Sequence, residues 1–266
     1  MLAIKCGVES EDNDLKLDQD WPVLVAKRNP SVEDSTVLNQ FKKQSPIHIF
    51  SSQSAVHFVA KTLEGIDTSH CDVSTMENCT AVGVGSATDS AAKGLQAKMS
   101  HLNIDTVDLR KDDRRENGLN WTLERLEHMG LIPRHEVILW TKTWSVSERL
   151  LNDFRSSRRW HNWIASTVEI YSLEPSAGPI PVSVITALAQ SRQVCFSVKS
   201  GEVLDATIAA LLAHLHKPTA RDLPQNILFS VWEKSALARA QQLYIQSRLI
   251  PAHEFDAALS ARDTQQ

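Results

Sequence analysis

The chain has 266 residues, 42% of them hydrophobic and 23% charged, a composition typical of a globular protein with a substantial core. A formal net charge of −4 excludes general electrostatic attraction to nucleic acid or to an anionic membrane. The sequence contains neither an uninterrupted apolar segment of membrane-spanning length nor an N-terminal secretory signal. We therefore expect a cytoplasmic protein with no nucleic-acid or membrane partner.

The four cysteines are scattered and form no Cys-x-x-Cys pair, which is typical of free thiols in a reducing compartment. They are Cys6, Cys71, Cys79 and Cys195. His70 lies beside Cys71, but further ligands at suitable spacing are missing, so the sequence predicts no metal site.

The first part of the chain predicts an acidic tail followed by one strand–helix unit. Residues Glu9 to Asp20 are acidic and nearly devoid of large apolar side chains, which is typical of a solvated tail. Trp21 to Ala26 is the first predicted strand. Ser31 followed by Asp34 predicts the cap of a helix that runs to about Phe41.

The stretch from Ile47 to Val56 organises the rest of the chain. Its apolar run, Ile47–Phe50, predicts a buried strand, and apolar residues at positions 56, 59 and 63 predict an amphipathic helix. Ser51, Ser52 and Ser54 lie at the turn between them. The first turn of a helix presents unpaired N–H groups and a positive dipole end, so this turn has the geometry of an anion-binding site. An ordinary capped helix after a strand is the alternative.

The same strand–turn–helix pattern recurs along the chain. Thr80 to Gly85 predicts a strand followed by the small residues Ser86, Ala87 and Thr88. Asn120 predicts a helix cap, and Gly130 stands where a helix-ending glycine belongs.

An extended segment and a proline-rich linker then precede the C-terminal units. Trp160 to Tyr171 reads as extended, and the linker contains prolines 175, 179 and 181. Val182–Ala189 predicts a helix and Gln193–Ser197 a strand that ends in Ser197-Val198-Lys199-Ser200-Gly201. Asn226–Ser230 predicts the last strand, with Ser235 in the turn that opens the next helix.

Alternating strands and helices predict an α/β fold whose sheets are mainly parallel, with helices on both faces. The polar turns then gather at the carboxyl ends of the strands, where open α/β sheets bind ligands. Phe50-Ser51-Ser52 and Phe196-Ser197 each lead into a long amphipathic helix, which indicates two related domains.

Four segments resemble the uroporphyrinogen-III synthase family in order and spacing. Ile49–Val56 is similar to the family's strand–turn–helix (I/V)FTSxxAV, and Ala81–Thr88 to its AVGxxT element. Val137–Leu139 with the Ser145 helix resembles a second-half unit, without its glycine. Val168–Tyr171 resembles the strand that leads back between the family's two domains.

The resemblance implies two flavodoxin-like (Rossmann-like) α/β domains with parallel sheets, one inserted in the other and joined to it by extended linkers. Residues 1–45 and 175–266 would form the discontinuous domain, and residues 46–174 the inserted one. The chain departs from the family pattern in three places. The connection between Val25 and Ile47 is shorter, the Phe196–Gly201 turn has an extra residue, and Ser235 replaces a threonine.

The implied activity is cyclisation of hydroxymethylbilane to uroporphyrinogen III, with loss of water and inversion of ring D, in tetrapyrrole (heme) biosynthesis. No organic cofactor or metal is needed, and a monomer is expected, with two lobes around a polar cleft. Hydroxyls and helix N-termini would hold the carboxylate arms of the substrate around that cleft. The implied substrate-binding residues are Ser51, Ser52, Ser54, Gly85, Ser86, Thr88, Ser197, Ser200 and Ser235.

Tyr171 is the implied proton donor to the departing hydroxyl, and its ring is expected at the junction of the lobes. A half-buried structural tyrosine is the alternative.

Two other functions stay open: a degenerate, non-catalytic tetrapyrrole-binding protein and a nucleotide-binding oxidoreductase. The second rests on Gly83-x-Gly85-x-x-Thr88 with Asp105 and Asp108 further on, which loosely imitates a dinucleotide fingerprint.

Overall fold

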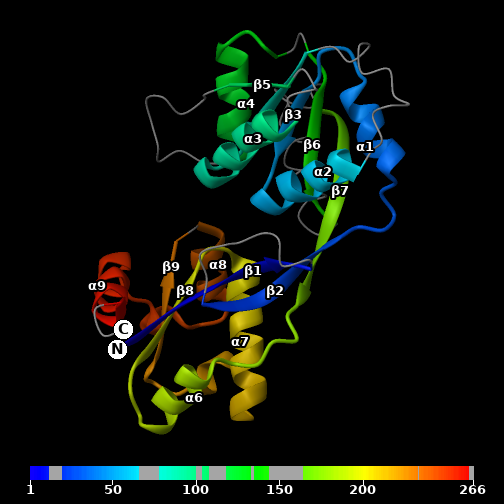
Figure 1. Ribbon diagram of the computed structural model, residues 1–266. Helices are drawn as coiled ribbons and strands as arrows, with labels where there is room; N and C mark the ends of the chain where they lie inside the picture. The colour runs from blue at the N-terminus through cyan, green and yellow to red at the C-terminus, as the bar shows by residue number, and fades with distance from the viewer. Residues whose placement is uncertain are drawn as a thin grey trace. The chain divides into compact units, whose positions relative to one another are not determined.

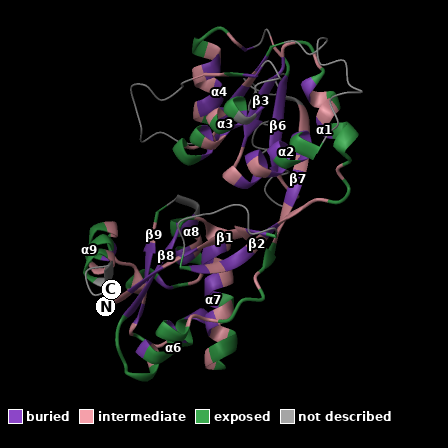
Figure 2. Ribbon diagram, in the orientation of Figure 1, coloured by how far each residue is buried: buried purple, intermediate pink, exposed green. Residues whose placement is uncertain are grey.

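The computed structural model describes residues 1–11, 20–65, 78–99, 104–107, 118–132, 135–143, 164–232 and 234–263. The chain is an α/β protein that divides into two compact units (Figure 1). Unit 1 comprises Met1–Ala26 with Glu174–Gln266, and unit 2 comprises Lys27–Leu173. In each unit, buried residues are concentrated along the strands and on the helix sides that face them (Figure 2). Among the described residues, none of the helices combines the length and apolar character that crossing a bilayer requires.

Unit 2 is a parallel sheet with helices on both faces. Its strands are β3 (Ile47–Phe50), β4 (Cys79–Gly83), β5 (Ile104–Thr106), β6 (Val137–Lys142) and β7 (Ile164–Pro175). They pair in the order β5-β4-β3-β6-β7, and each adjacent pair is parallel. Its helices are α1 (Asp34–Phe41), α2 (Gln53–Gly65), α3 (Ser86–Lys98) and α4 (Leu119–His128). The predicted alternation of strands and helices is therefore confirmed for this part of the chain.

The two faces of the unit 2 sheet carry different side chains because successive strand residues point to opposite sides. Ile47 and Ile49 pack with Leu123 and Leu126 of α4 in an aliphatic core. On the other face, His48 stacks on Phe41 of α1, with ring centroids 3.9 Å apart. The same face carries Phe50 and Trp140, whose ring centroids are 6.2 Å apart. The predicted buried strand after Pro46 is thus enclosed on both sides.

His48 is a fully buried neutral imidazole. Trp140 Nε1–H donates to His48 Nδ1 over 2.9 Å, so the proton of the neutral ring lies on Nε2. Burial, together with the smaller effect of the nearby Lys43 charge, lowers the pKa of His48 from its ordinary value of 6.5 to about 3. Below pH 6.5 the unfolded chain gains a proton that the folded protein does not bind, so stability falls with decreasing pH.

We expect the free energy of unfolding to fall between about pH 6.5 and pH 3 by at most ~1.4 kcal/mol per pH unit from His48. Above pH 6.5 this contribution is fully present. Urea denaturation of His48→Asn, whose amide can still accept from Trp140, should show a shallower pH dependence than the wild type. The same change at His128, which is exposed, is the control. Equal pH dependence in His48→Asn and the wild type would contradict the assignment.

Unit 1 is built around four parallel strands. Its strands are β1 (Leu2–Ser10), β2 (Trp21–Arg28), β8 (Val194–Val198) and β9 (Ile227–Val231), paired in the order β2-β1-β8-β9. Its helices are α6 (Val182–Ala189), α7 (Gly201–Leu215), α8 (Lys234–Gln242) and α9 (Ala252–Asp263), with 3-10 turns at Ala220–Asp222 and Gln246–Arg248. Ala3 and Cys195 pack against Phe255 of α9. Trp21, Phe196 and Phe229 form an aromatic row.

The strand orders of the two units differ. Numbered within unit 1, the order is 2-1-3-4, which corresponds to the flavodoxin order 2-1-3-4-5 without its last strand. Numbered within unit 2, the order is 3-2-1-4-5, as in doubly wound dinucleotide-binding sheets. The resemblance implied flavodoxin-like (Rossmann-like) parallel sheets without a particular strand order. In unit 2, β4 and β5 lie on one side of β3, and β6 and β7 lie on the other.

Strand β1 corrects the prediction that the first convincing strand begins at Trp21. Leu2–Ser10 pairs with both β2 and β8, and therefore lies inside the unit 1 sheet. Its burial pattern is irregular and shows no strict alternation, although Ala3, Ile4 and Cys6 are buried. Glu9 and Ser10, assigned to the acidic tail, belong to β1, while residues 12–19 lie outside the described residues.

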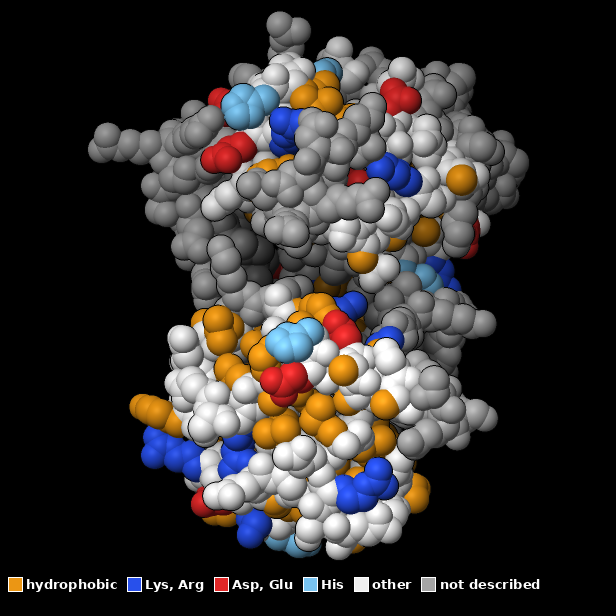
Figure 3. All heavy atoms as spheres, turned by 90° about the vertical axis from the view of Figure 1, so that its left-hand side faces the viewer, with side chains coloured by type: hydrophobic (Ala, Val, Ile, Leu, Met, Phe, Trp, Pro, Cys, Tyr) orange, Lys and Arg blue, Asp and Glu red, His pale blue; other side chains and the backbone are white. Residues whose placement is uncertain are grey.

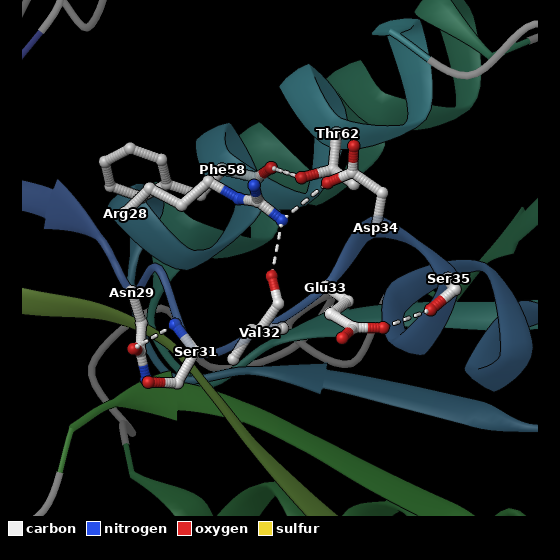
Figure 4. A network of polar contacts seen from close by, with 9 residues as sticks. All are labelled: Arg28, Asn29, Ser31, Val32, Glu33, Asp34, Ser35, Phe58 and Thr62. Carbon is white, nitrogen blue, oxygen red and sulfur yellow. Dashed lines mark hydrogen bonds and ion pairs between the residues drawn. The ribbon is translucent and has the colours of Figure 1, made fainter.

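The turn between β2 and α1 is held by a polar network, not by the predicted Ser31 cap (Figure 4). Arg28 Nη2 donates to Val32 O over 2.9 Å and to Asp34 Oδ1 over 2.7 Å. Ser31 N–H donates to Asn29 Oδ1 over 3.0 Å, so Ser31 belongs to an Asx turn. The helix begins instead after Glu33, which makes no side-chain cap bond.

The cap of α4 also differs from its prediction. Its N-cap is Gly118, so Asn120 lies inside the first turn. Gly130 does end the helix, with φ +72°, which confirms that prediction because glycine adopts this conformation without steric cost. The predicted Ser145 helix lies outside the described residues.

Two strands, β2 and β7, pass from one unit to the other. They are neighbours in the strand order β5-β4-β3-β6-β7-β2-β1-β8-β9. Inside unit 2, Asn29 N–H donates to Ile170 O over 2.9 Å, and Asn29 Nδ2 donates to Glu169 O over 2.8 Å. Inside unit 1, Ser176 N–H donates to Val23 O over 3.0 Å. Residues 27–45, which we assigned to the discontinuous domain, belong to unit 2.

Candidate functional site

The carboxyl end of β3 carries the serines of the organising stretch. Ser52 is the residue before α2, and its Oγ accepts from Ala55 N–H over 3.1 Å, as an N-cap does. Ser51 N–H donates to Trp140 O over 3.0 Å. Both serines are half-buried, whereas Ser54 is only 6% exposed within the first turn of the helix. Ser51 and Ser52 can therefore reach a ligand, and Ser54 is enclosed.

Tyr171 lies beside Ser52 although 119 residues separate them in sequence. The Tyr171 hydroxyl is 2.8 Å from Ser52 Oγ, and either oxygen can donate. The Tyr171 ring stacks on Phe58 of α2 with centroids 6.0 Å apart. Its exposure is 4%, so the ring is enclosed in unit 2, against the expectation of a ring that is deep in neither lobe. The ring is buried because Phe58 offers it an apolar surface and Ser52 satisfies its hydroxyl.

These groups lie at the topological switch point of unit 2. The chain leaves β3 toward β4 on one side and later returns to β6 on the other. Open α/β sheets bind ligands outside the carboxyl ends of strands at such points. Lys142, which sequence reasoning missed, ends β6 and pairs in register with Tyr171. Lys142 thus lies at the same carboxyl edge of the sheet as the hydroxyls of Ser52 and Tyr171.

The second predicted turn, at the start of α3, is less suited to an anion. Gly85 is the N-cap and makes no side-chain cap bond, Ser86 is exposed, and Thr88 is 7% exposed. Asp89 was missed by sequence reasoning: its carboxylate is buried in the first turn, and Gly83 N–H donates to Asp89 Oδ1 over 3.4 Å. A carboxylate near the positive end of the helix dipole competes with an external anion. Lys93 Nζ, at 3.2 Å from Asp89 Oδ2, offsets part of this charge.

The matching turns of unit 1 follow β8 and β9. Ser200 is the N-cap of α7, and its Oγ accepts from Val203 N–H over 3.3 Å. Ser197 is 7% exposed, and its Oγ accepts from Trp232 Nε1–H over 2.6 Å. Sequence reasoning missed Trp232, because the long-range contact leaves no local pattern. Ser235 falls at the start of α8, but its side chain lies outside the described residues.

Ser200→Ala should lower the free energy of unfolding of unit 1 by about 1 kcal/mol, because it removes the acceptor for Val203 N–H. Ser200→Gly should cost only about a few tenths of a kcal/mol, since glycine is a good N-cap residue. Chemical denaturation of the two variants measures the difference. Equal losses in both variants would contradict the capping role of the hydroxyl.

The charges and thiols of the described residues do not indicate metal chemistry. Within the described ranges, no three His, Cys, Asp or Glu side chains come close enough to hold a metal ion. His70 and Cys71 lie outside those ranges. Cys6, Cys79 and Cys195 are free thiols, and they are buried. Burial raises the pKa of each thiol to about 12.

The surface charges of the described residues are mixed in sign. On the face shown in Figure 3, Lys and Arg side chains are interspersed with Asp and Glu, and the described residues form no large patch of one sign there. An anionic ligand on this face would therefore depend on local donors such as hydroxyls and helix N-termini.

No family model matches the chain, and no curated protein is similar to it in sequence. Among solved structures, a mutant uroporphyrinogen III synthase from the extremely thermophilic bacterium Thermus thermophilus is 12% identical. That alignment covers 91% of this chain and 86% of that one, with a TM-score of 0.45. A second Thermus thermophilus uroporphyrinogen III synthase is 10% identical over 92% of this chain and 88% of that one, with a TM-score of 0.34. With TM-scores this low, the likeness by itself assigns neither a fold nor an activity to this chain.

Proposed function

We propose that the protein is a cyclising lyase of tetrapyrrole biosynthesis, a uroporphyrinogen-III synthase acting on hydroxymethylbilane. The observation that carries the proposal is the Ser52–Tyr171 hydroxyl pair, at 2.8 Å. The two residues belong to two of the four segments that resemble the family, Ile49–Val56 and Val168–Tyr171. Their meeting at the carboxyl edge of the unit 2 sheet supports a common role.

The hydroxyl pair suits the loss of water from the substrate. Ala55 N–H, at the start of α2, donates to Ser52 Oγ, which leaves the Ser52 O–H free to donate to the Tyr171 oxygen. The Tyr171 proton can then pass to the hydroxyl that leaves the bilane, and Ser52 stabilises the phenolate that remains. The electrophilic carbon is attacked by ring D, which is inverted as the macrocycle closes. The proton that ring D then loses returns to the Tyr171 phenolate, so water is the only other product. Holding the two ends of the bilane together contributes the remaining acceleration.

The carboxylate arms of the bilane need donors, and the described serines can supply them. Ser200 Oγ already accepts from Val203 N–H, and Ser197 Oγ from Trp232 Nε1–H. Each hydroxyl therefore keeps its own proton available for an external carboxylate. The remaining members of the proposed substrate-binding set are Ser51, Ser54, Gly85, Ser86, Thr88 and Ser235. Ser54 and Thr88 are buried, as Ser197 is, so these three hydroxyls require local opening.

The proposal includes an architecture of two α/β domains in a monomer, one inserted in the other. Units 1 and 2 would be those domains, with β2 and β7 as the extended linkers. It requires no organic cofactor or metal.

Incubation of the purified protein with hydroxymethylbilane tests the proposal. Uroporphyrinogen III should form faster than the uroporphyrinogen I that arises spontaneously. Formation of the I isomer alone, at the rate seen without protein, would refute the proposed function. Heat-denatured protein is the control.

A second candidate is a tetrapyrrole-binding protein without turnover. The 4% exposure of Tyr171 and the buried Asp89 carboxylate in α3 favour it. Binding of a porphyrin without isomer III formation would identify this case. A nucleotide-binding oxidoreductase has less support, because Asp89 lies where a pyrophosphate would approach the start of α3.

A further inference from the structure

Trp232 is a half-exposed aromatic side chain with a fixed indole. It directly follows β9, and its backbone N–H donates to Val198 O over 3.2 Å, which extends the parallel ladder past the strand end. Its Nε1–H donates to Ser197 Oγ over 2.6 Å. The side chain is nevertheless 50% exposed. Two hydrogen bonds therefore hold a large apolar ring at the surface.

The indole is bonded to one of two small hydroxyl residues that lie opposite each other on β8 and β9. Ser197 on β8 lies opposite Ser230 on β9 in the parallel register. Ser197 is 7% exposed and Ser230 is fully buried. Only Ser197 bonds the indole; Ser230 Oγ has no hydrogen-bond partner among the described residues. Ser197 is thus the anchor of the ring, and Ser230 is a neighbour of equal size that makes no such bond.

The position of Trp232 is one where α/β sheets contact ligands. It follows the carboxyl end of β9, and its backbone bond to Val198 places it beside the turn that carries Lys199 and the Ser200 cap. Lys199 is exposed. An exposed aromatic plane next to a cation and a helix N-terminus suits a flat, electron-rich ring that bears carboxylates.

We propose that Trp232, held by Ser197, is a stacking platform for a carboxylate-bearing pyrrole ring of the ligand. The proposal rests on the proposed function and adds a binding residue in unit 1. A ring already fixed by the Ser197 hydrogen bond loses little further freedom on binding, so most of the stacking energy contributes to affinity.

Binding of uroporphyrin I, a stable macrocycle of carboxylate-bearing pyrroles, can be followed by calorimetry. Trp232→Leu keeps apolar bulk but removes the aromatic face, and it should weaken binding roughly 10- to 100-fold. Trp232→Phe should recover part of the lost affinity. Tyr244→Leu removes another exposed aromatic ring of unit 1, 65% exposed and stacked on Arg221, and should bind as the wild type.

Substitutions of Ser197 and Ser230 test whether the Ser197 hydroxyl holds the indole in place. Ser197→Ala should weaken binding several-fold through loss of the indole hydrogen bond, whereas Ser230→Ala should leave affinity unchanged. Melting temperatures should stay close to that of the wild type in both Trp232 variants. Wild-type affinity in Trp232→Leu overturns the platform. The platform is also overturned if Trp232→Leu has a lowered melting temperature that accounts for its lost binding, and if Trp232→Phe has the same lowered melting temperature.

Parallel assays of hydroxymethylbilane turnover separate the two proposals. Isomer III formation by the wild type together with unaltered binding in Trp232→Leu overturns the platform alone. Uroporphyrin binding that depends on Trp232, without isomer III formation, supports the platform and refutes the proposed reaction. A wild type that neither binds uroporphyrin I nor forms isomer III overturns both.

Discussion

Tyr171→Phe should lower the turnover of hydroxymethylbilane by ~10²–10⁴-fold, the range typical of a lost general acid. The phenylalanine ring keeps the stack on Phe58, so packing is preserved. The variant loses only the hydroxyl that lies 2.8 Å from Ser52 Oγ, and its free energy of unfolding should fall by about 1 kcal/mol. Steady-state kinetics and chemical denaturation of the same preparation measure both effects.

The sequence provides a matched control, because it contains only two tyrosines. Tyr244→Phe removes a hydroxyl from a ring that is 65% exposed, and it should change neither turnover nor stability appreciably. A loss of only a few-fold in Tyr171→Phe would mean that water or a substrate carboxyl supplies the proton. Unchanged turnover with reduced stability would make Tyr171 a structural residue and would remove its proposed catalytic role.

Gly83→Ala should destabilise unit 2 by about 3 kcal/mol or more, as expected for severe overpacking. A Cβ at position 83 would lie 2.2 Å from Asp89 N and 2.4 Å from Thr88 C. Both are backbone atoms of α3, so no side-chain rotation can relieve the contact. The helix would have to move away from the end of β4, which would also break the Gly83 N–H bond to Asp89. Urea denaturation of the variant measures the loss.

Gly94→Ala is the control for this substitution. Gly94 lies in the same helix, α3, and a Cβ there would meet nothing within 4 Å. Because alanine favours helix over glycine, this variant should be about 0.5–1 kcal/mol more stable than the wild type. A Gly83→Ala variant as stable as the wild type would show that α3 can shift, and the close contact would then not be required.

Local patterns in the sequence predicted much of the secondary structure. The apolar run Ile47–Phe50 and the helical spacing of Val56, Val59 and Leu63 correspond to β3 and α2. The proline-rich linker, the helix from Val182 and the strand near Phe196 lie where they were expected. These features are readable because hydrophobic periodicity and turn residues act over a few neighbouring positions.

Strand β1 shows where such patterns fail. The burial pattern of Leu2–Ser10 does not alternate strictly, so its sequence lacks the two-residue period that marks a half-buried strand. The segment is a strand because it forms backbone hydrogen bonds with β2 on one side and β8 on the other. Contacts with distant strands, and not local preference, decide such a case.

The sequence by itself determined the alternating α/β organisation, the polar turns after the strands and the candidate hydroxyl residues. Only the tertiary structure decided which of them meet: Ser52 with Tyr171, Ser197 with Trp232, and Gly83 with the backbone of α3. It also revealed that Asp89 occupies the first turn of α3. Helix and strand signals depend on neighbours a few positions apart. The Ser52–Tyr171 and Ser197–Trp232 contacts instead join residues 119 and 35 positions apart, and the Gly83 contact depends on how α3 packs against the end of β4.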